Sequence, residues 1–137
     1  MGLKVDLKPH EQIIIGGCVI TNADTRARFH IEGDKIPILR EKDIMTPATA
    51  DTPAKLIYLA VQLMYLSSDP LGQHPVYFNL IRAIVSSTPS AWPIIEEINN
   101  NIMNGDLYKA LKETKKLITY EAGLIEQATA QQAKQSA

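Results

Sequence analysis

The stretch HEQIIIGGCVITNADTRARFHIEGDKIPILRE, residues 10–41, decides the fold of the N-terminal third of the chain. Short apolar runs alternate here with turn residues, a pattern typical of antiparallel strands joined by tight turns. Just before it, the segment LKVDL alternates in the same way and adds one more strand. We expect a small antiparallel β-meander with strands over residues 3–7, 12–15, 18–21, 25–31 and 35–39.

Beyond residue 45 the apolar side chains recur at helical spacing instead. About four helices are expected, with start signals at Thr52-Pro53, near Pro75, at Ser90 and at Asp106. The final segment QATAQQAKQSA has no apolar stripe, so we expect it to be disordered. The sequence predicts an α+β protein with a strand part over residues 1–45, a helical part over 46–126 and a disordered tail over 127–137.

Length and charge narrow the class of protein. A chain of 137 residues, 45% of them hydrophobic, is long enough to bury a core as one domain or a domain with a subdomain. The net charge of −1 carries no general signal for nucleic acid, so a nucleic-acid site must be a local cluster of cations. The longest apolar segment, residues 56–66, is too short to cross a bilayer, and no signal-peptide pattern is seen. We therefore expect a cytoplasmic protein without a membrane partner.

The residue types that catalysis or metal binding requires do not cluster in the sequence. The three histidines, His10, His30 and His74, are isolated from one another, and no glycine-rich phosphate loop precedes a helix. The single cysteine, Cys18, cannot form an internal disulfide, and its apolar strand favours a buried thiol. We expect no enzymatic activity, no catalytic residue, no metal and no cofactor.

Three potential cations occupy every second position of the predicted fourth strand: Arg26, Arg28 and His30. Because strand side chains alternate, these three share one face, and the apolar side chains between them share the other. Two interpretations remain open. The cations form either a solvated face paired with acids such as Glu11, Asp24 or Glu32, or a basic strip that contacts phosphates and unstacked RNA bases.

Three ordered blocks carry a resemblance to a known family. They are LKVDLKPHEQIIIGGCVITN, then ILREKDIMTPATADTPAKLIYLAVQLMYL, and finally GDLYKALKETKKLITYEA. Together they resemble the FlbT family of bacterial regulators of flagellin expression, over about residues 3–122. The chain departs from that family across residues 73–93 and at His10, where the family usually has a glycine.

The resemblance implies post-transcriptional control. It implies binding to the 5′ untranslated leader of a flagellin mRNA, with repression as the usual outcome and activation in some bacteria. It also implies a functional partnership with the small flagellar protein FlaF. A protein-interaction module that binds FlaF or flagellin, and affects the mRNA only indirectly, is the alternative function.

A second likeness concerns the two ends of the strand part. LKVDLKPHEQIIIG and ILREKDI are similar to the CsrA family of RNA-binding proteins. In that family an arginine at a closing strand edge contacts RNA beside the first strand, and Arg40 stands at the corresponding position. The first-strand arginine of the family falls on Leu7, so Lys8 is the nearest cation there. Arg40 has an alternative partner in Asp43, three residues on.

These observations predict an RNA-binding surface on the strand part. Its expected residues are Lys8, Arg26, Arg28, His30, Lys35 and Arg40. We also expect a homodimer, because strands at the edge of such a sheet leave backbone groups that a second copy covers.

Overall fold

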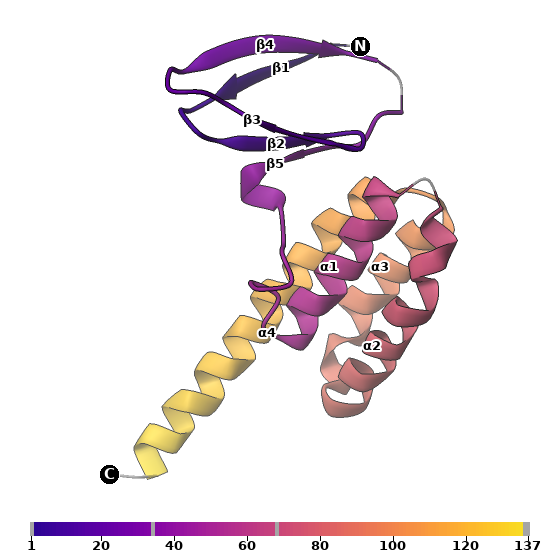
Figure 1. Ribbon diagram of the computed structural model, residues 1–137. Coiled ribbons are helices and arrows are strands. Elements are labelled where there is room, and N and C mark those ends of the chain that lie inside the picture. Colours follow the sequence, from indigo (N-terminus) through magenta and orange to yellow (C-terminus); the bar gives the residue numbers. More distant parts are fainter. Residues whose placement is uncertain (1, 34, 68, 136–137) are drawn as a thin grey trace. The chain divides into compact units, whose positions relative to one another are not determined.

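The computed structural model describes residues 2–33, 35–67 and 69–135. The chain divides into two compact units, Met1–Ile44 and Met45–Ala137. The first unit holds the strands and the second holds the four α-helices (Figure 1). The expected α+β class is therefore confirmed.

The strand unit consists of two antiparallel sheets. The first sheet pairs β1 with β4, and the second has the order β3-β2-β5 (Figure 1). The strands are β1 (Gly2–Leu7), β2 (Gln12–Ile15), β3 (Cys18–Thr21), β4 (Ala27–Glu32) and β5 (Ile38–Arg40), and the short 3₁₀ turn η1 (Glu41–Asp43) follows. One apolar cluster joins the two sheets: Val5, Leu7 and Ile13, with Leu3, Ile15, Phe29, Ile31 and Ile38 packed against them.

This topology differs from the expected meander, in which each strand would pair with the next along the chain. Only the hairpin of β2 and β3 pairs neighbours in sequence, whereas β1 pairs with β4 and β2 also pairs with β5. The physical reason is that nearly every strand carries one apolar face. Two small sheets bury those faces against each other, as a single flat meander of this size cannot do.

Backbone conformation explains why two strand boundaries differ from expectation. Lys35 has φ +60°, which interrupts extended structure, so β5 begins only at Ile38, after Pro37. His10 has φ +65°, the left-handed conformation that favours glycine. It occupies the turn between β1 and β2, and it is the position where the resembling family usually has glycine.

Cys18 is exposed, contrary to the expectation of a buried thiol. It begins β3, in which all the residues are exposed on both faces of the strand. The pattern CVIT suggested a covered strand, but β3 lies at the edge of its sheet, where only β2 flanks it.

The helical unit packs four helices around a common core. They are α1 (Pro53–Leu66), α2 (His74–Ser87), α3 (Trp92–Met103) and α4 (Leu107–Gln135), with short 3₁₀ turns η2 (Pro70–Gln73) and η3 (Pro89–Ala91) between them. Helix α4 packs against both α1 and α3, and α2 packs against α1. The side chains at the centre are fully buried: Ile57, Val61, Met64, Tyr77, Ile95, Ile98 and Leu117.

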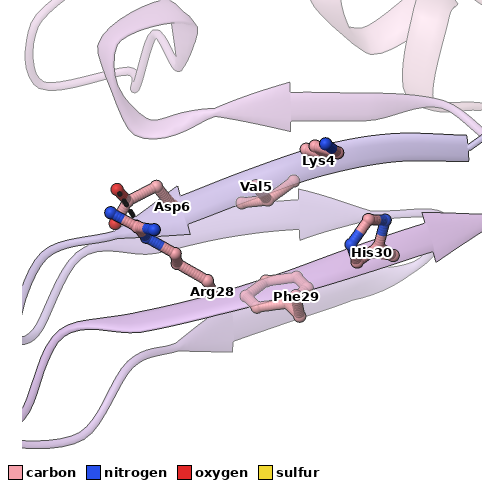
Figure 2. A pocket seen from close by; sticks show the side chains of 6 residues that line it. All are labelled: Lys4, Val5, Asp6, Arg28, Phe29 and His30. Carbon is pink, nitrogen blue, oxygen red and sulfur yellow. Dashed lines mark ion pairs between the residues drawn. The ribbon is translucent and has the colours of Figure 1, made fainter.

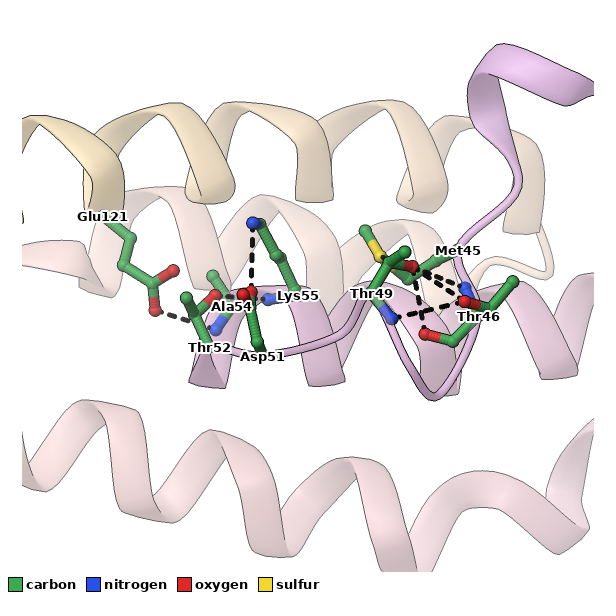
Figure 3. Close-up of polar contacts among 8 residues, drawn as sticks. All are labelled: Met45, Thr46, Thr49, Asp51, Thr52, Ala54, Lys55 and Glu121. Atoms are coloured by element: carbon green, nitrogen blue, oxygen red, sulfur yellow. Dashed lines mark hydrogen bonds and ion pairs between the residues drawn. The ribbon is translucent and has the colours of Figure 1, made fainter.

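The start of α1 is stabilised by one hydrogen bond to a residue close in sequence and by another to a residue on α4 (Figure 3). As expected, Thr52 caps the helix, its hydroxyl accepting from the Lys55 N–H at 3.3 Å, and Pro53 is the first helical residue. In addition, the carboxylate of Glu121, on α4, accepts from the Ala54 N–H at 2.9 Å. A negative group at this position satisfies an orphan donor and complements the helix dipole.

One of the two later cap predictions is confirmed and the other is wrong. Asp106 caps α4 through the N–H of Lys109, at 3.4 Å. Ser90, however, lies inside η3 and its hydroxyl bonds to that of Tyr120, so it does not cap α3. The residue at the N-cap position of α3 is Ala91, so this helix starts without a side-chain cap.

The expectation of a disordered tail is wrong as far as Gln135, because α4 continues to that residue. The described side chains from residue 126 onward are all exposed, so no packing stabilises this end. Alanine and glutamine have high intrinsic helix propensity, and they extend the helix begun by the packed part. Residues 136–137 lie outside the described part. Among the described residues, no helix has both the length and the apolar character that a membrane span requires.

Candidate nucleic-acid interface

The outer face of the β1–β4 sheet carries a row of charged side chains, which we call the basic strip: Lys4, Asp6, Arg26, Arg28 and His30. The strand register places Lys4 opposite His30 and Asp6 opposite Arg28. Residues directly opposite each other share a face, so two β1 side chains join the cations of β4. Arg26 extends the row just before β4 begins.

The predicted alternation of β4 is confirmed. Its described residues alternate between half-buried and exposed along the whole strand. Phe29 and Ile31 pack against the core cluster, while the Arg28 side chain is 84% exposed. The apolar residues of this strand therefore fix which way its cations point.

A single carboxylate contacts both arginines of the strip. The Nε of Arg26 lies 2.8 Å from Asp6 Oδ1, and the Nε of Arg28 lies 3.6 Å from Asp6 Oδ2. The hydrogen bond from Arg26, with the charges of both arginines, lowers the pKa of Asp6, and the same bond raises the pKa of Arg26. The acid that pairs with these arginines is thus Asp6, from the neighbouring strand, rather than Glu11, Asp24 or Glu32.

The strip keeps an excess of positive charge. Lys4, Arg26 and Arg28 are three cationic side chains against the one carboxylate of Asp6, and Glu32 is the further exposed acid of β4, beyond His30. All these groups are on strands or directly beside one, so the sheet holds them in a fixed row.

A shallow pocket runs along this row (Figure 2). Its lining residues are Lys4, Val5, Asp6, Arg28, Phe29 and His30. Figure 2 shows Asp6 and Arg28 meeting at one end, with Lys4 and His30 further along the same two strands. A phosphate in this pocket would lie between the guanidinium group of Arg28 at one end and the side chains of Lys4 and His30 at the other.

The structure brings together only part of the expected RNA-binding surface. Arg40 approaches β1, where its Nη2 lies 3.5 Å from the carbonyl oxygen of Lys4, a long and weak contact. Lys35 follows the end of β4 opposite to Arg26. Lys8 lines a different hollow, which it shares with Glu11 and Glu41.

Sequence reasoning missed Lys4 and Asp6. Their alternation with Leu3 and Val5 marked them as the outer face of the first strand, but not which strand would lie beside it. Their neighbours depend on the pairing of β1 with β4, two strands far apart in sequence, which a local sequence pattern does not reveal.

The chemistry that this arrangement supports is electrostatic binding. Among the described residues, no group of three or more His, Cys, Asp or Glu side chains is placed to hold a metal ion. Two arginines and a lysine in a row on a sheet suit the phosphates of an extended strand, with arginine able to bond in a bidentate way.

Comparison with known proteins identifies the family. The model of the family described as "Flagellar protein FlbT" matches residues 3–125. A "probable flagellum biosynthesis repressor protein FlbT 1" of Bradyrhizobium diazoefficiens is 68% identical over 124 residues, which cover 90% of this chain and 85% of that protein. The FlbT protein of Rhodopseudomonas palustris strain TIE-1, named in the same way, is 50% identical over 91% of this chain and 98% of its own length.

A more distant relative extends the same match. The "flagellum biosynthesis repressor protein FlbT" of Caulobacter vibrioides strain ATCC 19089 is 36% identical over 126 residues, covering 88% of this chain and 87% of that protein. No solved structure matches the chain significantly. The family model covers most of the strand unit and the helical unit as far as residue 125, so only the last part of α4 lies beyond the match. The chain belongs to the FlbT family of flagellar proteins.

Proposed function

We propose that this protein represses flagellin synthesis by binding the 5′ untranslated leader of a flagellin mRNA through the basic strip. The repressor role follows the names of its relatives, which are called flagellum biosynthesis repressors. The observation that carries the RNA contact is the row of three cations against one carboxylate on the outer face of β1 and β4.

Binding through this strip is modest in strength and sensitive to salt. An RNA phosphate competes with Asp6 for Arg26 and Arg28, so part of the Coulomb gain replaces an ion pair that already exists. With about two to four phosphates contacted, the logarithm of the binding constant falls with the logarithm of salt with a slope of about −1 to −3.

Electrophoretic retardation of a flagellin leader by the purified protein, repeated across a salt series, tests this proposal. We expect Arg28→Ala to weaken binding and to reduce the salt slope by about one. Lys134→Ala is the matched control, because it removes an exposed cation near the end of α4. Equal effects of the two substitutions, or no retardation at low salt, would contradict a specific role for the strip.

A second candidate function is a protein-interaction module in which the helical unit binds FlaF or flagellin. Several large apolar side chains of that unit are exposed, including Leu63 at 42%, Val76 at 52% and Met103 at 73%. Capture of purified FlaF that Met103→Lys abolishes, together with an absence of leader retardation, would favour this alternative. The effect on the mRNA would then be indirect.

A further inference from the structure

Strand β3 has an edge that no described strand covers. It pairs with β2 on one side only. Exposed edges in soluble proteins usually carry charged side chains, proline or bulges that prevent pairing with another chain. The opposite edge of this sheet follows that rule, since Pro37 precedes β5 and Arg40 ends it. By contrast β3 has no charge and no proline, and Val19 is 60% and Ile20 40% exposed.

The hydrogen-bond pattern shows which backbone groups point to this edge. The N–H of Asn22 donates to the carbonyl oxygen of Glu11 at 2.9 Å, one position beyond the pair of Gln12 and Thr21, so this bond fixes the phase of the β2–β3 ladder. Bonded and non-bonded positions alternate along an antiparallel ladder, so the backbone of Ile20 also bonds to β2 whereas the backbone groups of Val19 and Thr21 do not. The N–H and C=O groups of Val19 and Thr21 therefore point away from β2, into solvent.

We infer that a second copy of this chain pairs with β3 in antiparallel fashion, about a twofold axis that passes beside Ile20. In this register Val19 lies opposite Thr21 of the second copy, and the reverse also holds. Every outward N–H and C=O group of these two residues then has a partner. The result is one continuous sheet with the strand order β5-β2-β3-β3-β2-β5.

A second copy fits this edge because the edge is complementary to itself. The uncharged sequence CVIT brings no like charges together when it meets its own copy. Ile20 lies opposite Ile13, a fully buried core residue, so the two share the core face of the sheet. Two copies of Ile20 side by side would extend that apolar layer across the axis. The basic strip lies on the other sheet, so two strips are not forced together.

Disulfide trapping tests the register directly. In a Cys18→Ser background, Ile20→Cys places two thiols on residues directly opposite each other, with Cα atoms about 4.5 Å apart, which suits a disulfide. Val19→Cys in the same background is the control, because its two copies are offset by two residues, about 7 Å along the strands. The native Cys18 thiols are offset by four residues, about 13 Å. We expect rapid cross-linking of Ile20→Cys alone.

Sedimentation equilibrium tests the dimer without any cysteine chemistry. We expect a mass near twice the 15.2 kDa of one chain. Val19→Pro removes a single outward donor without touching the β2 ladder, and Ile20→Lys sets two like charges side by side; each should raise the dimer dissociation constant about tenfold or more. Circular dichroism confirms that the variants fold. A monomer at all concentrations, a dimer that both variants leave intact, or faster cross-linking of Val19→Cys would each overturn the inference.

Discussion

Asp6 and Arg26 form the shortest ion pair on the β1–β4 sheet, with Oδ1 and Nε 2.8 Å apart, and the same carboxylate also faces Arg28. Asp6 lies on β1, Arg28 on β4 and Arg26 directly before β4, and these two strands are adjacent in space but not in sequence. Asp6 therefore both orients the arginines and competes with any anion that approaches them. Its removal separates these two effects.

We predict that Asp6→Asn tightens the binding of a flagellin leader by about threefold to tenfold and makes its salt dependence steeper, because two guanidinium groups become free for phosphate. Filter binding across a salt series measures both quantities. Asp24→Asn, which removes an exposed acid beside His10, is the control. Weaker binding by Asp6→Asn would show instead that orientation of the arginines outweighs competition.

The pH dependence of this pair has a definite sign. The pKa of Asp6 is lowered in the folded protein, so its contribution to folding is complete at neutral pH and is lost as pH falls below the usual aspartate value of about 3.9. Asp6 stays ionised between pH 5 and pH 8, so a change of pH within this range should not change its effect on RNA binding.

Gln62 anchors the segment that enters the helical unit, and we predict that Gln62→Leu lowers the free energy of unfolding by about 1–3 kcal/mol. Its buried side-chain amide accepts from the Met45 N–H at 2.7 Å and donates to the Met45 carbonyl oxygen at 3.0 Å. Leucine would leave both backbone groups unpaired. Urea denaturation measures the change, and Gln131→Leu, an exposed glutamine of α4, should alter stability far less.

Tyr77 should make the protein sensitive to alkali. Burial raises the pKa of Tyr77, whose hydroxyl donates to Asn99 Oδ1. The folded state keeps this proton while the unfolded state loses it above pH of about 10, so the free energy of unfolding falls as pH rises beyond that value. Thermal melts from pH 8 to pH 11 should show a smaller loss for Tyr77→Phe. An identical loss in both proteins would mean that other groups dominate the alkaline transition.

We predict that Glu121→Ala destabilises the helical unit by about 0.5–2 kcal/mol, because it removes an acceptor and a negative charge from the start of α1. The measurement is chemical denaturation followed by circular dichroism. Glu126→Ala, an exposed acid five positions later on the same helix, is the matched control and should change stability little. Equal effects would show that the bond to Ala54 contributes nothing measurable.

Local features of the sequence predicted well and non-local ones did not. The cap at Thr52, the proline at the first position of α1 and the alternation around Phe29 depend on neighbours in sequence, and the structure confirms all three. The pairing of Asp6 with Arg26 and Arg28 depends on strand order, which periodicity does not encode. The Ser90 prediction was wrong for the same reason, since its partner, Tyr120, lies 30 positions away.

The end of α4 shows a different limit. An apolar stripe reports packing, so its absence correctly indicated the exposed side chains of residues 127–134 but not the backbone conformation. Helix propensity is sufficient there because the preceding turns, around the buried Leu117, are already fixed. The prediction from composition considered this end as an isolated peptide and left out the helix that precedes it.

The bond between Glu121 and Ala54 joins residues 67 positions apart. During translation at about 5–20 residues per second, the ribosome needs about 3–13 s to make that interval. The nascent chain can thus pair its strands while the first helix still lacks this acceptor. A synthesis pause before codon 121 would leave the emerging helices incomplete and open to chaperones for that whole period.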